Sequence, residues 1–424
     1  MNALFFAILG VTIIMGLPIG FAIIITSFVF LMMNDFPTLG IVAQRMVGGV
    51  DSFPLLALPF FILAGDLMAY GTTPRLMAVA NTFFGHIRGG MAVSGVTASA
   101  FFGAISGSGV ATTAAVGSLM EPEMVKKGYS KGFTASIFAG AGALGVVIPP
   151  SLAMVVYGVA ANASIGDLFL AGIVPGIFAA VALMVYSIWA SHQYGYPKNE
   201  NKSTWFEKGR AIKVGILPLV MPVIILGGVI SGVFTPTESG VVAVVYAFIL
   251  ATFVYKELPL KQLPAVMVRS AKNSAVILFV IAAATPFGWV MATQQIPQEV
   301  ASWMLSLTSS FVLLSLMLLL LLLILGTFME TIAIIVIATP ILMPVVHQIG
   351  LNPIHFGVVM MLALAIGGAT PPLAVNLFVS TKIIDIRMED TFPHILQVVG
   401  VLVAASVIVL LVPSMSLWIP SLGK

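Results

Sequence analysis

The chain has 424 residues, of which 60% are hydrophobic and 8% are charged, and its mean hydropathy is +1.13. This composition excludes a water-soluble globular domain and indicates a polytopic membrane protein, whose net charge of +3 reports loop topology rather than nucleic-acid binding. Without any cysteine, the sequence offers no disulfide, no thiol nucleophile and no thiolate metal site.

Apolar runs near the roughly 20 residues that cross a bilayer predict the membrane helices. In chain order they cover 3–32, 54–70, 132–162, 168–192, 214–232, 239–255, 273–292, 354–381 and 393–418. The first run is too long for a signal-peptide core and has no basic residue before it, so we expect one retained helix there.

Two further apolar runs, about 89–120 and about 310–343, are too long for a single crossing. The first contains Ser106-Gly-Ser-Gly109 and the second contains Gly326 to Thr331 near its middle. We predict that both are re-entrant helical hairpins, which enter and leave the bilayer on the same face. Two long helices with glycine kinks are the alternative.

The positive charges support the hairpins. With them, sixteen of the eighteen Lys and Arg residues fall on one side of the membrane: Arg75, Arg88, Lys126, Lys127, Lys131, Lys198, Lys202, Lys208, Arg210, Lys213, Lys256, Lys261, Arg269, Lys272, Lys382 and Arg387. Arg45 and Lys424 fall on the other side. Because cytoplasmic loops are rich in Lys and Arg, we expect a cytoplasmic N-terminus and a periplasmic C-terminus.

The same word, G-x-x-x-P-P, occurs at Gly145 to Pro150 and again at Gly367 to Pro372. Two adjacent prolines remove backbone donors and stop a helix. Such a break is tolerated at membrane depth only where it lines a cavity inside the protein. Paired breaks in two halves of a chain are typical of the binding site of a secondary transporter.

Further offsets indicate an internal repeat. Pro74 and Pro297 are 223 residues apart, as are Gly103 and Gly326. We therefore predict an all-α polytopic membrane protein of two inverted repeats, each with a hairpin and a broken helix. The predicted boundaries are 1–192 with a broken helix about 132–162, 193–238 with a cytoplasmic loop and linking helix, and 239–424 with a broken helix about 354–381.

Each hairpin tip is expected to meet the proline break of its own half. Ser106 to Gly109 would face Gly145 to Ser151, and Gly326, Thr327 and Met329 would face Gly367 to Pro372. Serine hydroxyls and freed carbonyls are the hard oxygen ligands of Na⁺, so two equivalent sites suggest at least two coupling ions. The alternative is that these small residues only permit close helix packing.

Several polar residues of the apolar segments are candidates for substrate binding: Thr112, Thr113, Ser151, Glu330 and Asn376. Glu330 at the second tip either shapes an ion site or caps the outgoing helix, whereas Asp66 is expected to be structural. No Lys or Arg lies at predicted midplane depth, so half-helix N-termini and bound ions would hold an anion. Hydrolase and nucleotide-binding motifs are missing, so no enzyme is expected.

Five segments together resemble the large membrane subunit of tripartite ATP-independent periplasmic (TRAP) transporters. They are 51–65, the tip Ser106-Gly-Ser-Gly109, 147–151, 234–240 and 352–357. The resemblance implies Na⁺-coupled import of a small organic acid, such as sialic acid or a C4-dicarboxylate, across the bacterial inner membrane by an elevator motion. It also implies two partners, a small four-helix membrane subunit and a periplasmic substrate-binding protein.

The resemblance also implies the ligands of two sodium ions. The first set is Ser106, Ser108, Gly145, Ile148 and Pro150, and the second is Gly326, Met329, Gly367, Thr370 and Pro372. Glu330 departs from the family, where many relatives have aspartate. An autonomous Na⁺/dicarboxylate symporter that needs no binding protein is the alternative function, and a channel or a membrane scaffold is the alternative of another class.

Overall fold

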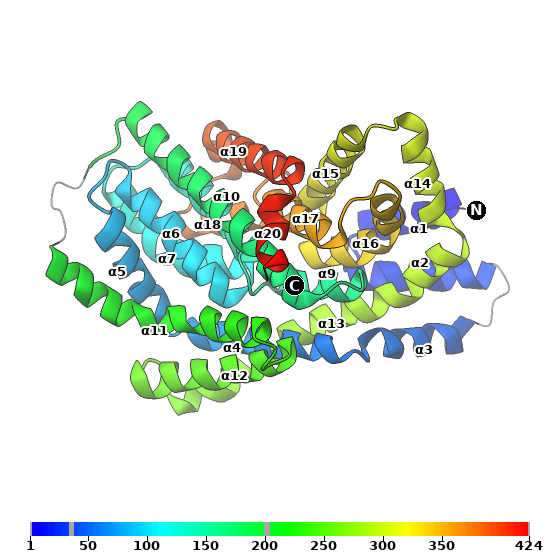
Figure 1. Cartoon of the computed structure of the whole chain (residues 1–424), viewed down its shortest axis with the longest axis horizontal. Helices are drawn as coiled ribbons and strands as arrows, with labels where there is room; N and C mark the ends of the chain where they lie inside the picture. The colour runs from blue at the N-terminus through cyan, green and yellow to red at the C-terminus, as the bar shows by residue number, and fades with distance from the viewer. Residues whose placement is uncertain (1, 34–37, 199–203, 423–424) are drawn as a thin grey trace.

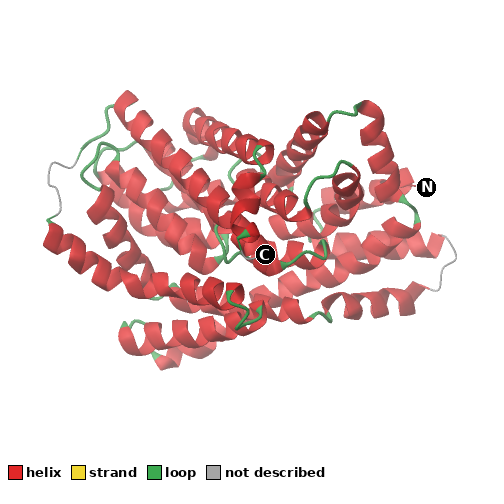
Figure 2. Cartoon of the chain, in the orientation of Figure 1, coloured by secondary structure: helices red, strands yellow, loops and turns green. Residues whose placement is uncertain are grey.

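The computed structural model describes residues 2–33, 38–198 and 204–422, and every regular element in these ranges is a helix (Figure 2). Within the same ranges, seven helices are long and apolar enough to cross a membrane, or nine if each of two bent pairs is one span. The predicted all-α class is therefore confirmed.

The chain begins with two short helices instead of one span. They are α1 (Asn2–Ile14) and α2 (Ile19–Met33), which pack against each other. The prediction of one helix over 3–32 was wrong, because Gly16 adopts a positive φ of 78° and Pro18 carries no N–H donor. Hydropathy alone could not show this turn, since the residues around it are apolar.

The first half continues through seven helices and one 3₁₀ turn (Figure 1). They are α3 (Thr38–Val50), η1 (Phe53–Leu56), α4 (Ala57–Met68), α5 (Thr72–Phe84), α6 (Gly90–Ser106), α7 (Gly109–Lys126), α8 (Lys131–Val147) and α9 (Leu152–Ala160). Helices α6 and α7 form the first predicted hairpin, joined by Gly107 and Ser108. Helices α8 and α9 form the first broken helix, bent by 47° at the double proline.

The middle of the chain holds long membrane helices. They are α10 (Ile165–Gln193), α11 (Trp205–Ile230) and α12 (Pro236–Ile249), the last extended by a π-helical turn, η2 (Leu250–Val254). Helices α11 and α12 both start with a capping box, Thr204 with Glu207 and Thr235 with Glu238. Because these reciprocal bonds satisfy the first backbone donors, both helices begin several residues before their apolar runs.

The second half repeats this order after the short turn η3 (Leu260–Gln262). Its helices are α13 (Leu263–Thr293), α14 (Ile296–Leu307), α15 (Phe311–Phe328), α16 (Thr331–Gln348), α17 (Pro353–Gly367), α18 (Val375–Ile383), η4 (Met388–Thr391), α19 (Phe392–Leu411) and α20 (Ser414–Ser421). Helices α15 and α16 form the second hairpin, and α17 and α18 form the second broken helix. The run predicted at 393–418 is divided at Val412 into α19 and α20.

The broken helices occupy the centre of the molecule. Helix α8 is buried from Gly132 to Val147, and α17 is buried from His355 to Gly367. The two helices contact each other, and α18 packs against α7 and α8 of the first half. A helix that is apolar on all sides must be covered on all sides, so both α8 and α17 lie in the core.

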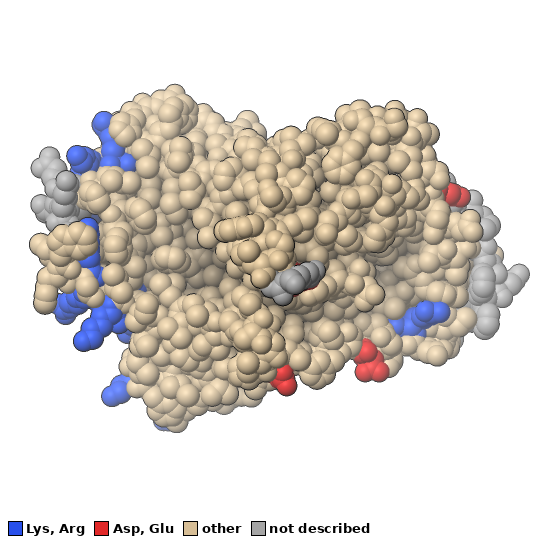
Figure 3. Space-filling view, viewed as in Figure 1, with Lys and Arg blue, Asp and Glu red and all other residues tan. Residues whose placement is uncertain are grey.

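On the face that Figure 3 shows, the Lys and Arg side chains gather at one end. Figure 3 shows most of the visible Lys and Arg atoms at the left end, over the neighbouring ends of α10 and α11, and one patch at the right, over α3. Lys202 and Lys424 lie outside the described residues. This distribution agrees with the predicted segregation, while the side of the membrane that each end faces stays a prediction.

Candidate substrate and ion site

A cavity of about 900 Å³ lies where the two hairpin tips meet the second proline break. Its floor is formed by Ser106 to Ala111 of the first tip and Met329 to Ile332 of the second. One wall comes from α4, where Ile62, Gly65, Asp66 and Ala69 recur at the three- and four-residue spacing of one helix face. Helix α13 supplies the adjoining wall.

The first hairpin is pressed against the first proline break. A Cβ atom built on Gly103 would lie 2.7 Å from the Cα of Gly145, so only glycine allows these helices to approach this closely. At the tip itself, the backbone N–H of Leu152 donates to the carbonyl oxygen of Gly107 at 3.4 Å. The tip and the break therefore form one unit.

The second hairpin meets the second break in the same way. A Cβ atom on Gly326 would lie 3.1 Å from the Cα of Gly367. The N–H of Leu373 donates to the carbonyl oxygen of Thr327 at 3.3 Å. The predicted meeting of each tip with the break of its own half is thus confirmed, with a matching glycine pair and backbone bond in both halves.

Oxygen atoms converge at the first tip. The Ser106 Oγ lies 3.1 Å from the Thr112 Oγ1 and 3.4 Å from the Ser108 carbonyl oxygen. Thr112 donates to that carbonyl at 2.8 Å. A Cβ atom on Gly145 would lie 2.5 Å from the Thr112 Oγ1. Hydroxyl and carbonyl oxygens suit a hard monovalent cation, so Ser106, Ser108 and Gly145 fit the proposed sodium site, whose occupancy stays a prediction.

The two other residues of the first predicted sodium set, Pro150 and Ile148, differ in the atoms that could bind an ion. A Cβ atom on Gly107 would lie 3.0 Å from the carbonyl oxygen of Pro150, so that oxygen borders the tip. Ile148 directly follows the last residue of α8, and its side chain packs against Gly176 of α10. Only the backbone carbonyl of Ile148 could therefore serve an ion.

In the second predicted set, Gly326 and Met329 line the cavity. The Thr370 hydroxyl donates to the carbonyl oxygen of Ile366 at 2.7 Å, and its oxygen keeps acceptor capacity. Pro372 follows Pro371 through a cis peptide bond, as Pro150 follows Pro149 in the first half. The two breaks therefore share their backbone form as well as their sequence.

Glu330 has a capping role in the structure. Its carboxylate accepts hydrogen bonds from the N–H groups of Ile332 at 2.9 Å and Ala333 at 3.2 Å, at the start of α16. Ser108 occupies the equivalent cap of α7 in the first hairpin, where it accepts from Ala111 at 3.4 Å. Since Glu330 also lines the cavity, a substrate contact is compatible with the cap and stays a prediction.

The other predicted substrate residues divide into two groups. Asn376 lines the cavity, and its Nδ2 donates to the carbonyl oxygen of Ala139 at 3.5 Å. Thr112, Thr113 and Ser151 lie behind the cavity lining: Thr113 donates to Gly109 at 3.1 Å, and Ser151 donates to Val146 at 2.6 Å. Their hydroxyls hold the tips and breaks together, and direct contact with a substrate stays a prediction.

Sequence reasoning missed Arg269 and Asn273, which also line the cavity. The predicted span began at 273, whereas α13 begins at Leu263, so Arg269 lies inside the helix. It forms an ion pair with Asp66 of α4, with 3.4 Å between Nη2 and Oδ1. The four-residue spacing of Arg269 and Asn273 was the available signal, because such residues share one helix face.

Comparison with known proteins identifies relatives along nearly the whole chain. Residues 6–415 match the family described as "Tripartite ATP-independent periplasmic transporter, DctM component". The chain is 37% identical over 411 residues to the sialic acid TRAP transporter large permease protein SiaM of Vibrio cholerae, covering 96% of this chain and 95% of that protein. It is 35% identical over 433 residues to the C4-dicarboxylate large permease DctM of Rhodobacter capsulatus, covering 98% of each.

The isethionate TRAP transporter permease DctMQ of Oleidesulfovibrio alaskensis is 41% identical over 417 residues, which cover 97% of this chain and 65% of that longer protein. Among solved structures, the YdaH transporter of Alcanivorax borkumensis aligns with a TM-score of 0.56 and 14% identity over 90% of this chain and 89% of that one. This likeness concerns the fold alone. The identities and the family match together show that the chain belongs to the DctM family of TRAP transporter large permeases.

Proposed function

We propose that this chain imports a small organic acid with Na⁺, as the permease of a tripartite system. The cavity is the observation that supports this proposal, because both hairpin tips and residues beside the second proline break line one space large enough for a small acid. The relatives are named for isethionate, C4-dicarboxylates and sialic acid, and all of these are organic anions.

Sodium would bind at the two meetings of tip and break. At the first, Ser106, Ser108 and Thr112 supply oxygens, and the matching glycine pair and backbone bond support a related site at the second. Each Na⁺ that enters gains about 2.3 kcal/mol per 100 mV of membrane potential. Two ions would therefore drive the accumulation of a monoanion against its gradient.

Alternating access would be an elevator motion. The hairpins and broken helices would move together, because a backbone hydrogen bond joins each hairpin tip to the proline break of its own half, and α18 packs against α7 and α8. The walls supplied by α4 and α13 would stay in place, since these two helices pack on each other from different halves of the chain. The substrate would move with the tips past these walls.

The end rich in Lys and Arg would face the cytoplasm. Because α1 and α2 turn back on each other, the first residues and the start of α3 lie on the same side, away from that end (Figure 1). The expected cytoplasmic N-terminus assumed one crossing over 3–32, and with two short helices there instead we propose a periplasmic N-terminus. The C-terminus would also be periplasmic, where a binding protein would deliver substrate, beside a small four-helix membrane subunit.

Uptake into proteoliposomes tests this function. The chain would be reconstituted with its small subunit and given radiolabelled succinate, N-acetylneuraminate and isethionate, with and without an inward Na⁺ gradient and the binding protein. Uptake that needs both Na⁺ and the binding protein is expected. Na⁺-driven uptake without a binding protein would instead establish an autonomous symporter, and unsaturable flux without Na⁺ dependence would establish a channel.

A further inference from the structure

One face of α13 forms a wall of the cavity whose polarity changes along the helix. The residues that line it are Arg269, Asn273, Val276, Ile277 and Val280, which repeat at three- and four-residue intervals. The face is polar at its first two positions and apolar beyond them. Arg269 is six residues from the first residue of α13, which corresponds to about 9 Å along the helix axis.

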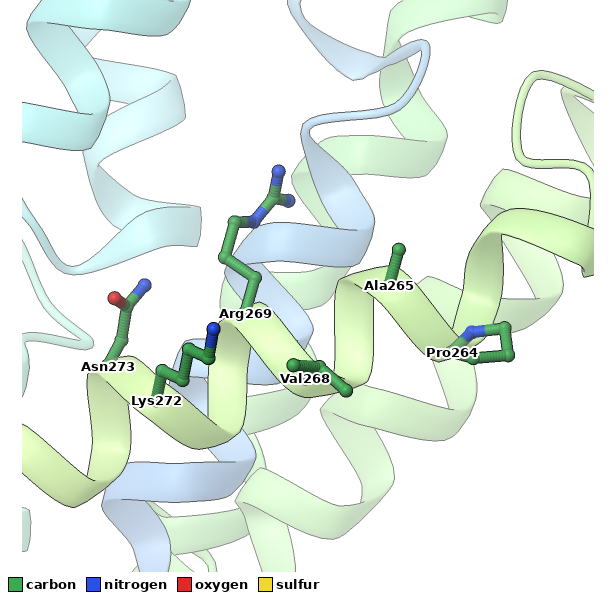
Figure 4. Close-up of a pocket in the computed structure, with 6 residues that line it drawn as sticks. All are labelled: Pro264, Ala265, Val268, Arg269, Lys272 and Asn273. Atoms are coloured by element: carbon green, nitrogen blue, oxygen red, sulfur yellow. The ribbon is translucent and has the colours of Figure 1, made fainter.

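The polar end of this face also borders a second space. A groove of about 490 Å³ lies along the start of α13 and is lined by Pro264, Ala265, Val268, Arg269, Lys272 and Asn273. Figure 4 shows the side chains of Arg269 and Asn273 extending to the same side of the helix. Arg269 and Asn273 are common to the groove and the cavity, so both side chains border the two spaces.

Arg269 is the only cation among the described residues that line the cavity, and the acids there are Asp66 and Glu330. The Glu330 carboxylate is engaged in capping α16. Asp66 accepts a short hydrogen bond of 2.6 Å from the Ser270 hydroxyl, through the oxygen that does not face Arg269. Asp66 therefore keeps a partner when Arg269 moves away.

The ion pair between Arg269 and Asp66 is loose. The one described contact between the two charges is 3.4 Å long, and the side chains are 52% and 22% exposed. A guanidinium carries five N–H donors in a planar fork that matches a carboxylate. Most of these donors are therefore available to a ligand, and a pair this exposed adds little to stability.

We propose that Arg269 and Asn273 form an exit subsite for the carboxylate of the transported acid, with Asp66 as its competitor. The inference rests on the proposed function and adds a binding position to it. An anion released by the hairpin tips displaces Asp66 from the guanidinium, while Ser270 holds the aspartate. Asp66 then reclaims Arg269, and the anion leaves through the groove.

The test is exchange of labelled for unlabelled acid across the membrane of proteoliposomes. The concentration of unlabelled acid is varied on the side of the membrane to which the groove opens. The acid is whichever of succinate, N-acetylneuraminate or isethionate the wild type transports. Arg269→Gln is expected to raise the half-saturating concentration on that side about tenfold, because a charge-assisted bond is lost. Asp66→Asn is expected to lower it, because the competitor is gone. Lys272→Gln, which removes the same charge from the groove alone, should change it less than about twofold.

The opposite signs separate this role from a structural one. If the pair only held α4 to α13, Arg269→Gln and Asp66→Asn would impair exchange in the same direction, and that result overturns the inference. An effect of Arg269→Gln equal to that of Lys272→Gln also overturns it. Should Arg269→Gln fail to fold, Arg269→Lys and Asp66→Asn must still shift the constant in opposite directions. A folded wild type that transports no acid refutes the proposed function instead.

Discussion

The closest backbone approach in the site gives the sharpest prediction. A Cβ atom on Gly367 would lie 2.5 Å from both the Cα and the carbonyl oxygen of Gly326, whereas ordinary contacts begin at 3.4 Å. The Gly326 carbonyl carbon lies closer still, so Gly367→Ala must push α15 and α17 apart by about 1 Å, because backbone atoms cannot rotate away as a side chain can. The second hairpin tip would then no longer pack closely against the second proline break.

The size of this effect follows from packing. Overfilling a close contact costs about 1–3 kcal/mol. An unfolding entropy of about 2.1 cal/mol/K per residue, over the whole chain, converts this to a fall in Tm of about 1–3 °C. Gly368→Ala is the matched control, because its Cβ would meet the nearest atom, the Ala365 carbonyl oxygen, at 3.4 Å, and it gains the same backbone rigidity.

The assay is thermal unfolding of both purified variants in the same detergent, followed by Na⁺-driven uptake. Gly367→Ala is expected to melt below the wild type and to transport poorly, whereas Gly368→Ala should melt at or above the wild type. A Gly367→Ala variant that melts at or above Gly368→Ala would refute the close approach of the two glycines.

Three further predictions concern single side chains. Ser106→Ala should raise the Na⁺ concentration for half-maximal uptake roughly tenfold. Ser99→Ala should not, since the Ser99 hydroxyl is buried in the same helix and has no hydrogen-bond partner in the part of the chain that the structure describes; equal effects would exclude an ion at the first tip. Glu330→Ala should cost about 1 kcal/mol by removing the cap of α16 while Glu330→Asp keeps it, which thermal unfolding measures; equal melting of the two variants would exclude the cap. Glu121→Met in α7 should preserve or raise Tm, because one buried oxygen of the Glu121 carboxyl group has no hydrogen-bond partner among the described residues, and Ser380, which donates to the other oxygen, can still donate to the Ala135 carbonyl. A marked fall in Tm would contradict this.

The sequence predicted the hairpins and broken helices well because proline and glycine act locally. The double prolines end α8 at Val147 and α17 at Gly367, close to the expected positions. Helix ends were less accurate where polar caps extend a helix beyond its apolar run, as Thr204 does for α11. The turn between α1 and α2 was missed since it interrupts hydropathy very little.

The candidate site was predicted only in part. Ser106, Ser108, Gly326, Met329, Glu330 and Asn376 line the cavity as a binding role requires. Thr112 and Ser151 instead bond to the Ser108 and Val146 carbonyls behind it. A sequence shows which side chains can donate hydrogen bonds, but the rotation of each helix decides whether a donor faces the cavity or a neighbouring carbonyl.

By itself, the sequence determined the membrane class, the internal repeat, the two breaks and the family resemblance. Composition, proline spacing and short motifs can be read along the chain and do not depend on which helices pack together. The tertiary structure decided that α18 packs against the first half, that Gly326 meets Gly367, and that Arg269 faces Asp66 at 3.4 Å in the cavity wall. These pairings join residues tens to hundreds of positions apart, and only the packing of buried helices brings them together.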